Sequence, residues 1–382
     1  MKKIVLGFIS DTDPKDRRPW SGTKNKLYEQ IKGCTSEVIW IKVSYNWQTI
    51  IYRAFLLLFS IVCGKRYSSI HTTFIAKRLS KSIRKSDLDK VDVLFAPSGS
   101  QYLYLLKTDK PIIYLADATF KSIYNYYPLF DNFFSFNIKQ GNLIEKVALE
   151  KAWRVIASSE WCKNSMINDY NINPSVIRTI EFGANVDEKD IEKINCIREG
   201  NKLNLLFLAV EWERKGGDIA VECVQELNLM GIDANLYIVG QDLPQKYASI
   251  VNVYSIGFLN KNIPEEYNRF LDIIQQSDIL LLPTKAECSA IAFCEASAYG
   301  LPVFTYDTGG ISNYVENGIN GYRLPLNARG KDFADKIKEV IDSNEFTELS
   351  VGGRSMYKEK LNWHSWQKAF KLLLDELCES VK

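Results

Sequence analysis

The sequence has little histidine and no paired cysteines. Its 382 residues include two histidines, His71 and His364, which lie far apart. They offer no cluster for zinc and little support for a Ser-His-Asp triad. The eight cysteines are scattered without any C-x-x-C spacing, which is typical of a reduced intracellular protein. We therefore expect neither a disulfide framework nor a histidine-based metal site.

The sequence also lacks a long apolar run. The longest candidate, Thr49–Cys63, would span about 23 Å as a helix, which is short of the roughly 30 Å hydrocarbon core of a bilayer. The amino terminus passes from a short apolar run, Ile4–Ile9, directly into polar residues with no small-residue cleavage site. This pattern predicts a first β-strand rather than a signal peptide.

Charge is divided unevenly along the chain. Residues 1–150 carry 23 Lys and Arg against 13 Asp and Glu, whereas the remainder carries 25 against 33. A length of 382 residues with 46% apolar and 25% charged residues indicates a folded protein of two domains. The basic front half is expected to meet something anionic, such as a membrane surface, nucleic acid or phosphate.

Short β-branched runs alternate with amphipathic stretches in two sets, which predicts an α/β fold of two Rossmann-like domains with parallel sheets. The polar stretch Asp187–Lys202 separates the sets. We expect a first domain over 1–186, a second over 187–360, and a last helix within 361–382 that packs on either domain. The strands expected are Ile4–Ile9, Glu37–Val43, Val91–Ala96, Pro111–Leu115 and Arg154–Ala157, then Leu203–Ala209, Asn235–Val239, Val251–Ser255, Ile279–Pro283 and Val303–Tyr306. The helices expected in the second set include Asp218–Leu229, Pro264–Gln276 and Asp332–Ser343.

The segment Thr49–Cys63 departs from this alternation. It is almost uncharged, and a cluster of cations follows it closely. An apolar wedge beside cations fits a helix lying in the interface of an anionic membrane; the alternative is a core helix followed by a solvated basic helix. Nucleic acid is disfavoured because no recognition motif accompanies the charge. The residues expected on the membrane or acceptor side are Trp47, Arg53, Phe55, Leu56, Phe59, Lys65 and Arg66.

The most informative stretch is Leu282–Val303, where the pattern is strand, loop, helix, glycine and next strand. Glu287 lies in the loop and Glu295 in the helix, eight positions apart. Small residues between them leave the backbone N–H groups at the helix start open to an anion. Carboxylates on either side can accept hydrogen bonds from hydroxyls. A phosphate flanked by hydroxyls describes a sugar nucleotide.

These residues resemble the retaining glycosyltransferase family four, which has the GT-B fold and an E-x7-E motif. The run Ala298-Tyr299-Gly300-Leu301-Pro302-Val303 also matches that family's pattern. Further similar stretches are Phe207–Gly217, Ser158–Trp161, Glu181–Asn185, Asp307–Ile311 and Asn317–Gly321. The resemblance covers nearly the whole chain and is densest between residues 203 and 325.

The resemblance implies roles for particular residues. Lys215 is expected to neutralise the donor phosphates, Glu287 to contact the transferred sugar, and Glu295 to bind the ribose hydroxyls. The catalytic set is Lys215, Glu287 and Asp117, and the donor-binding set is Gly22, Arg214, Lys215, Gly257, Phe258, Ser289, Ala290, Ile291, Ala292 and Glu295.

Two positions depart from the family pattern. Val210 stands where the family usually has an arginine, which Arg214 can replace, and Asp117 stands where many relatives have a histidine. Asp117 orients a sugar or acceptor hydroxyl, or else caps a helix.

The function implied is transfer, with retention, from a nucleotide sugar (UDP- or GDP-linked) to a glycan or lipid-linked acceptor. The implied enzyme needs no metal or other cofactor, and it is cytoplasmic and peripherally bound to the inner membrane face. Asp11 and Asp13 form a D-x-D of the type that binds metal in other transferases, but it comes too early in the chain for that fold. The alternatives are a sugar-nucleotide epimerase, which the scarcity of histidine disfavours, and a catalytically silent scaffold that binds nucleotide and membrane.

Overall fold

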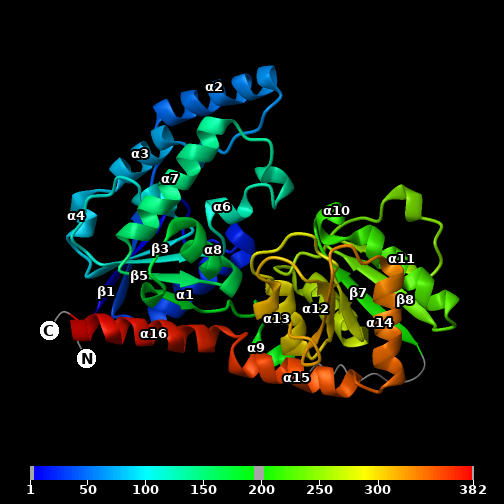
Figure 1. Ribbon diagram of the computed structural model, residues 1–382. Coiled ribbons are helices and arrows are strands. Elements are labelled where there is room, and N and C mark those ends of the chain that lie inside the picture. Colours follow the sequence, from blue (N-terminus) through cyan, green and yellow to red (C-terminus); the bar gives the residue numbers. More distant parts are fainter. Residues whose placement is uncertain (1–3, 193–201, 381–382) are drawn as a thin grey trace. The chain divides into compact units, whose positions relative to one another are not determined.

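The computed structural model describes residues 4–192 and 202–380, which form two compact units (Figure 1). Unit 1 comprises the chain up to Glu181 together with the C-terminal segment from Trp366, and unit 2 comprises Phe182–Ser365. Most of the polar stretch expected to separate the domains, residues 193–201, lies outside the described residues.

Unit 1 is built on a six-stranded parallel sheet in the order β2-β1-β3-β4-β5-β6. The central strands β3 and β4 are buried throughout, as expected of a parallel sheet covered on both faces. Five strands were predicted from the sequence, and the short β6 was not. The strands are β1 Val5–Ser10, β2 Glu37–Lys42, β3 Val93–Pro97, β4 Ile112–Ala116, β5 Arg154–Ala157 and β6 Ile177–Thr179.

Helices cover the sheet of unit 1, and they include the last helix of the chain. In α16 (Trp363–Ser380), the rings of Trp366 and Phe370 meet Phe95 of β3 edge-on at 6.4 and 5.5 Å. From Trp366 onward this helix therefore packs on unit 1. The other helices of unit 1 are α1 Thr23–Cys34, α2 Trp47–Cys63, α3 Thr73–Ser82, α4 Lys85–Leu88, α5 Ser100–Leu103, α6 Phe120–Ile123, α7 Ser135–Lys151 and α8 Glu160–Tyr170.

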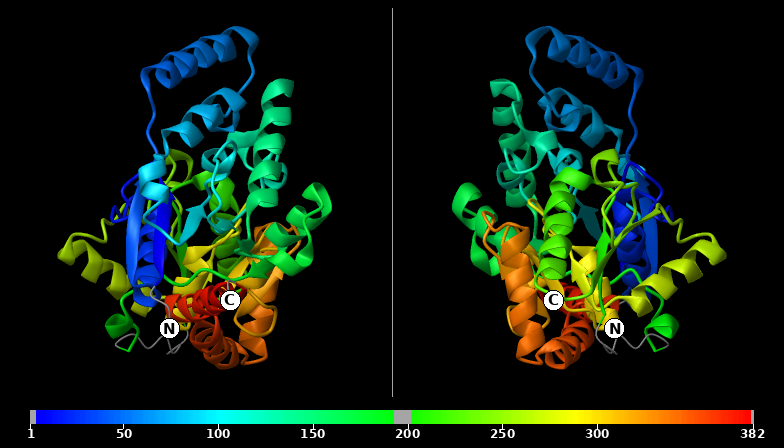
Figure 2. Two further views of the ribbon diagram at one scale, coloured as in Figure 1. Left: turned by 90° about the vertical axis from the view of Figure 1, so that its left-hand side faces the viewer. Right: turned by 90° about the vertical axis from the view of Figure 1, so that its right-hand side faces the viewer.

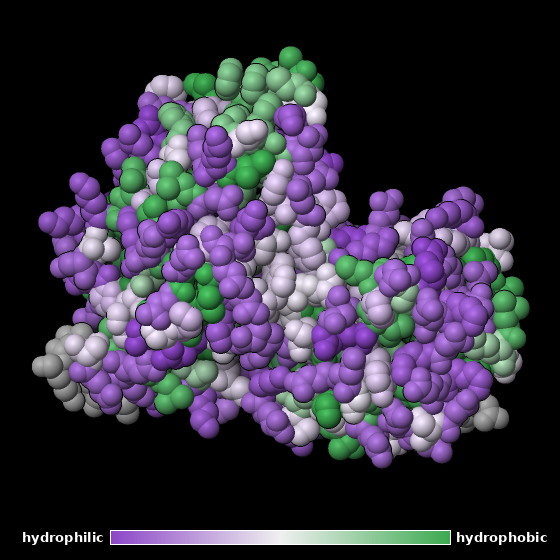
Figure 3. Space-filling model, viewed as in Figure 1, coloured by the Kyte–Doolittle hydropathy of each residue, from purple (hydrophilic) through white to green (hydrophobic). Residues whose placement is uncertain are grey.

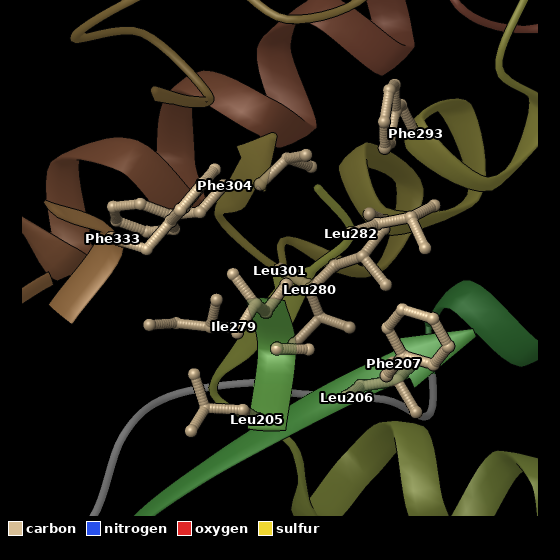
Figure 4. Close-up of a cluster of buried hydrophobic side chains, with 14 of the residues drawn as sticks. Leu205, Leu206, Phe207, Ile279, Leu280, Leu282, Phe293, Leu301, Phe304 and Phe333 are labelled. Carbon is tan, nitrogen blue, oxygen red and sulfur yellow. The ribbon is translucent and has the colours of Figure 1, made fainter. Parts of the chain in front are cut away.

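Unit 2 also has a six-stranded parallel sheet, in the order β12-β11-β10-β7-β8-β9, so its first strand β7 lies between β8 and β10, whereas β1 of unit 1 lies between β2 and β3. Its core lies where β7 and β10 meet α13, with Phe207, Leu282 and Phe293 among the buried side chains (Figure 4). The strands are β7 Leu203–Leu208, β8 Ala234–Val239, β9 Val253–Gly257, β10 Ile279–Leu281, β11 Val303–Tyr306 and β12 Gly321–Leu324. The helices are α9 Glu188–Ile191, α10 Trp212–Lys215, α11 Gly217–Leu229, α12 Pro264–Gln276, α13 Ile291–Tyr299, α14 Gly330–Asp342 and α15 Phe346–Glu359.

The apolar segment after Trp47 forms a helix, α2, that lies at the outer edge of unit 1 (Figure 2). Asn46 starts it with a capping box that includes Thr49, and Gly64 ends it with a left-handed cap. Thr49 and Leu56 are its two buried residues, so α2 is not a core helix. The expectation that Leu56 faces a membrane is wrong, because this side chain is 2% exposed and anchors the helix to unit 1. In the part of the chain that the structure describes, no helix is long and apolar enough to cross a bilayer.

Candidate functional site

Three loops of unit 2 meet at the carboxyl edge of its sheet. They follow the neighbouring strands β7, β10 and β11, whose carboxyl ends open on the same side, as ligand-binding loops of parallel sheets do. Lys285 N donates to Arg214 O at 2.8 Å, and Gly310 N donates to Glu287 O at 3.0 Å. These backbone hydrogen bonds hold the loop side chains of β7 and β10 in one cluster.

The centre of this cluster is an ion pair between Lys215 and Glu287. The Lys215 ammonium donates to Glu287 Oε2, and the Arg214 guanidinium lies 3.7 Å from the same oxygen. The three side chains are only 12–14% exposed. The structure thus brings together three residues that the sequence assigned to phosphate and sugar binding.

Glu211 is a further member of the cluster that sequence reasoning missed. Arg214 forms a bidentate ion pair with Glu211, with hydrogen bonds of 2.7 and 3.0 Å. This hydrogen bonding lowers the pKa of Glu211. Arg214 also donates to Ala286 O at 2.8 Å. Val210, which precedes Glu211 in the sequence, is 65% exposed. The position where the family usually has arginine therefore presents an apolar side chain to solvent.

Gly216 allows this loop to approach the end of β10. Its φ is +77°, and a Cβ there would lie 2.2 Å from Pro283 O. Any other residue would clash with that backbone, so the glycine fixes Lys215 at the sheet edge.

The second predicted carboxylate lies in α13 and has its own cation. Glu295 is 6% exposed, and Lys261 Nζ donates to its Oε2 at 3.1 Å. Lys261 also lies over the ring of Phe270, 4.2 Å from its centre. Lys261 lies in the loop after β9 and precedes Glu295 by 34 positions in the sequence. No motif in the sequence indicated this pair.

The start of α13 has no side-chain cap on its backbone N–H groups, as the small residues there predicted. Ala290 occupies the N-cap position and supplies no side-chain hydrogen bond, so the first-turn N–H groups of Ile291 and Ala292 have no side-chain cap. Ser289 and Ala292 are partly exposed beside it.

Gly257 ends β9, which is separated from β10 by the two strands β7 and β8, and Phe258 follows it. Gly257 has a φ of +81° and its carbonyl accepts from Gly240 N at 2.9 Å. Phe258 is 68% exposed, so its ring presents a large apolar surface to solvent.

In unit 1, the predicted residues Gly22 and Asp117 are linked through a tryptophan. Trp20, Ser21 and Gly22 have successive φ values of +54°, +53° and +84°, which is a strained conformation for the first two. Trp20 Nε1 donates to Asp117 Oδ2 at 3.2 Å. Asp117, just after β4, therefore holds the glycine turn through the indole, a role that neither proposed alternative for it included.

The D-x-D at the end of β1 is occupied by other contacts. Lys24 of α1 lies 3.6 Å from Asp11 Oδ1 and donates to Thr12 at 2.8 Å, while Asp13 accepts from Lys15 N at 2.9 Å. Among residues 4–192 and 202–380, no group of three or more His, Cys, Asp and Glu side chains is arranged to hold a metal ion.

A buried carboxyl lies beneath the same edge of unit 1. Glu145 is 3% exposed and accepts from the Tyr114 hydroxyl at 2.9 Å. Burial raises the pKa of Glu145 to about 7. Nothing in the sequence distinguished this glutamate from Glu150, the other glutamate of α7.

The sequence of unit 2 matches a known family. Residues 187–350 match the family described as glycosyl transferases group 1. An uncharacterized glycosyltransferase of Methanocaldococcus jannaschii is 22% identical over 64% of this chain and 65% of its own length. The chain spans between about half and two thirds of the length of the curated relatives that it matches first. These matches support a glycosyltransferase.

Solved structures extend the likeness to nearly the whole chain. A sucrose-phosphate synthase from Thermosynechococcus elongatus has a TM-score of 0.68 at 13% identity, with 99% of this chain and 100% of the other covered. An Anabaena protein solved in complex with UDP and glucose has a TM-score of 0.63 at 15% identity, with 98% and 100% covered. The two parallel α/β units therefore have the GT-B fold.

Proposed function

We propose that the protein transfers a sugar from a nucleotide diphosphate sugar to a glycan or lipid-linked acceptor, with retention at the sugar carbon. The observation that carries this proposal is the Lys215–Glu287 pair at the carboxyl edge of unit 2, beside the uncapped start of α13. A cation and open N–H groups suit a diphosphate, and the adjoining carboxylate suits sugar hydroxyls.

Lys215 is proposed to neutralise the diphosphate as the sugar leaves. In the structure it pairs with Glu287, so an incoming phosphate exchanges places with a carboxylate. Release of Lys215 frees Glu287 to accept from a hydroxyl of the transferred sugar. Arg214, which lies 3.7 Å from Glu287, is proposed to supply the second cation. It would replace the arginine that the family usually has at the position of Val210. Charge stabilisation and positioning then account for catalysis without a covalent nucleophile.

The remaining donor contacts follow from the neighbouring strands. Glu295 is proposed to exchange Lys261 for the ribose hydroxyls, and Phe258 with Gly257 to support the base. Backbone N–H groups of Ser289–Ala292 are proposed to hold the distal phosphate. The UDP complex of the Anabaena structure favours a uridine donor, with GDP as the alternative.

In unit 1, Asp117 is proposed to bind a hydroxyl of the sugar or acceptor, and Gly22 to take part in donor binding. The acceptor is proposed to be presented at the inner face of a membrane, because unit 1 carries the basic half of the sequence. The reaction is proposed to need neither a divalent metal nor a resident cofactor, since Lys215 and Arg214 provide the positive charge.

A thermal-shift panel of UDP-, GDP- and ADP-sugars tests the donor proposal. A ligand at 100 times its Kd adds about 2.7 kcal/mol to the free energy of unfolding, so the true donor raises Tm by several degrees. Glu295→Ala, which is proposed to lose the ribose contact, should show about half of that rise. If no nucleotide sugar raises the Tm of the parent protein, the proposal fails.

Turnover in EDTA tests the role of metal. With the donor found above, the rate of sugar transfer or donor hydrolysis should be the same in EDTA and in Mg²⁺. A collapse to background in EDTA contradicts the electrostatic account given to Lys215 and Arg214. Conversion of the donor into an epimer, with no transfer, would favour the epimerase alternative.

A further inference from the structure

Helix α2 presents its apolar side to solvent. Nine large apolar side chains on it are between 40% and 83% exposed: Trp47, Ile50, Ile51, Phe55, Leu57, Leu58, Phe59, Ile61 and Val62. The space-filling view shows hydrophobic residues gathered over this helix (Figure 3). Contiguous exposed apolar surface on this scale marks an interaction site in a folded protein.

The side of α2 that packs on unit 1 is the more polar one. It consists of Thr49, Tyr52, Leu56 and Ser60, spaced three or four residues apart along one stripe. The ring of Tyr52 is tilted against that of Phe74 of α3, with 4.5 Å between the ring centres, and Phe59 at the border of this side stacks on Phe134 at 4.8 Å. Ser60 hydrogen-bonds to the carbonyl of Lys65. This is the reverse of an ordinary surface helix, whose apolar stripe faces the core. The outward face is thus built for apolar surroundings.

The sequence around α2 contains no negative charge. From residue 38 to residue 86 there is no Asp or Glu, while nine cations are present: Lys42, Arg53, Lys65, Arg66, Lys77, Arg78, Lys81, Arg84 and Lys85. Lys65 and Arg66 immediately follow the helix and are exposed, as are Lys77 and Lys81 on α3. An apolar face bordered by cations matches the apolar interior and anionic headgroups of a bilayer.

This charge pattern also argues against the other occupants. A second copy docked through α2 would bring two such cationic segments together, and like charges across an interface are unfavourable. The neighbouring carboxylate Asp131 is already paired with Arg66 of the same chain.

A protein partner usually meets a patch with a polar rim and several hydrogen bonds. Among the nine exposed apolar side chains of α2, the indole of Trp47 is the hydrogen-bonding group, and it suits the headgroup region. Gln48 and Arg53 are the polar side chains beside them, and the Arg53 guanidinium lies 5.6 Å from the centre of the Tyr45 ring.

We propose that α2 is a membrane anchor that lies in the plane of an anionic bilayer. Its 17 residues give a length of about 26 Å, which lies flat in the interface. Ile51, Leu58 and Ile61, opposite the buried stripe, insert most deeply, and Lys65 and Arg66 contact the headgroups. This inference does not depend on the proposed sugar transfer.

Co-sedimentation of the full chain with lipid vesicles tests the anchor. Binding to vesicles of phosphatidylcholine mixed with phosphatidylglycerol should exceed binding to phosphatidylcholine alone and should fall as salt is added. The double variant Ile51→Gln/Leu58→Gln should bind the mixed vesicles at least tenfold more weakly. Gln keeps a high helix propensity, so the helix itself should persist.

The matched control is Leu229→Gln/Leu372→Gln. These leucines are 80% and 59% exposed, on α11 and α16, and the control should bind vesicles as the parent does. Both double variants should melt at the parental temperature, because all four side chains are exposed. Equal losses in both, equal binding to the two vesicle types, or no vesicle binding by the parent would each overturn the anchor.

Sedimentation velocity without lipid separates the anchor from self-association. The parent should be monomeric at the concentrations used for vesicle binding. A parental dimer that Ile51→Gln/Leu58→Gln dissociates, with vesicle binding unchanged, would assign α2 to a second copy of the chain and overturn the proposal.

Discussion

Units 1 and 2 each have a six-stranded parallel sheet but place apolar and charged side chains in opposite surroundings. In unit 2 the apolar helix α13 buries seven of its nine residues, whereas in unit 1 the apolar helix α2 buries two of seventeen. Carboxylates of the unit 2 cluster face cations across ion pairs, whereas Glu145 of unit 1 is buried against a tyrosine. Two parallel α/β units of one chain therefore differ in their chemistry: unit 2 has a cluster of ion pairs, and unit 1 has an exposed apolar helix and a buried acid.

The difference between the two apolar helices can be tested by matched phenylalanine truncations. Phe293 of α13 is fully buried, so Phe293→Ala should lower the free energy of unfolding by about 3–5 kcal/mol. Phe55 of α2 is 59% exposed, so Phe55→Ala should change it by no more than about 0.5 kcal/mol. Urea unfolding of the two variants measures both values. Similar losses would mean that α2 is packed against something in solution.

The unit 2 ion pair is expected to govern turnover. Lys215 is proposed to face the charge that grows on the leaving diphosphate, so Lys215→Ala should lower kcat by about 10²–10³. Lys246→Ala is the matched control, since Lys246 is an exposed lysine of unit 2 that pairs with Asp218. Steady-state kinetics on both variants, after their melting temperatures are shown to match the parent, decides the assignment. A parental kcat in Lys215→Ala would place the site elsewhere.

The buried acid of unit 1 should appear in the pH dependence of stability. The pKa of Glu145 is raised from 4.5 to about 7, so the folded state holds a proton there that the unfolded state has lost. The free energy of unfolding therefore falls as the pH rises from about 4.5 to 7. Burial lowers the pKa of His71 from 6.5 to about 4, which has the opposite effect over an overlapping range. The parent should accordingly show a shallow profile.

Glu145→Gln should uncover the His71 contribution. The amide still accepts from Tyr114 but cannot ionise, so the variant should gain up to about 3 kcal/mol over the parent between pH 5 and 8. Glu150→Gln on the same helix alters a half-exposed carboxylate and serves as the control. Urea midpoints across this pH range measure the slopes. Parallel profiles for the parent and Glu145→Gln would show that Glu145 is ionised in the folded state.

The smallest expected effect concerns donor affinity. Ribose hydroxyls change little during transfer, so Glu295→Ala should raise the donor KM roughly tenfold with kcat within a few fold of the parent. The two variants should therefore differ in the kinetic constant that changes, which is KM for Glu295→Ala and kcat for Lys215→Ala. A kcat loss as large as that of Lys215→Ala would show that Glu295 contributes in the transition state.

Most of the sheet architecture could be predicted from the sequence because parallel strands leave a strong local pattern. Ten of the twelve strands were predicted, and the two that were missed, β6 and β12, have three and four residues and contain arginine. Hydropathy identified the helix at α2 but placed Leu56 on the wrong side. The direction in which a helix packs depends on its neighbours, and the sequence of α2 is apolar nearly all round.

The candidate site was predictable where a motif is local and not where partners are distant in sequence. Lys215, Glu287 and Glu295 lie in short recognisable stretches. The pairs Lys261–Glu295, Trp20–Asp117 and Tyr114–Glu145 join residues separated by 34, 97 and 31 positions. Such pairs form between elements that the fold brings together, and the local spacing of residues in the sequence does not indicate them.

The caps of α2 mean that the anchor is already folded in water. Many interfacial helices are disordered until they meet a lipid surface, and ordering them offsets part of the gain from insertion. In this chain, Asn46 and Gly64 close the two ends locally, and Leu56 fixes the helix to unit 1. The helix would therefore attach to lipid as a rigid element, and it would hold the rest of unit 1 at a set angle to the lipid plane. Detachment would leave the apolar face of α2 exposed to water. This protein would then be prone to bind other apolar surfaces whenever lipid is scarce.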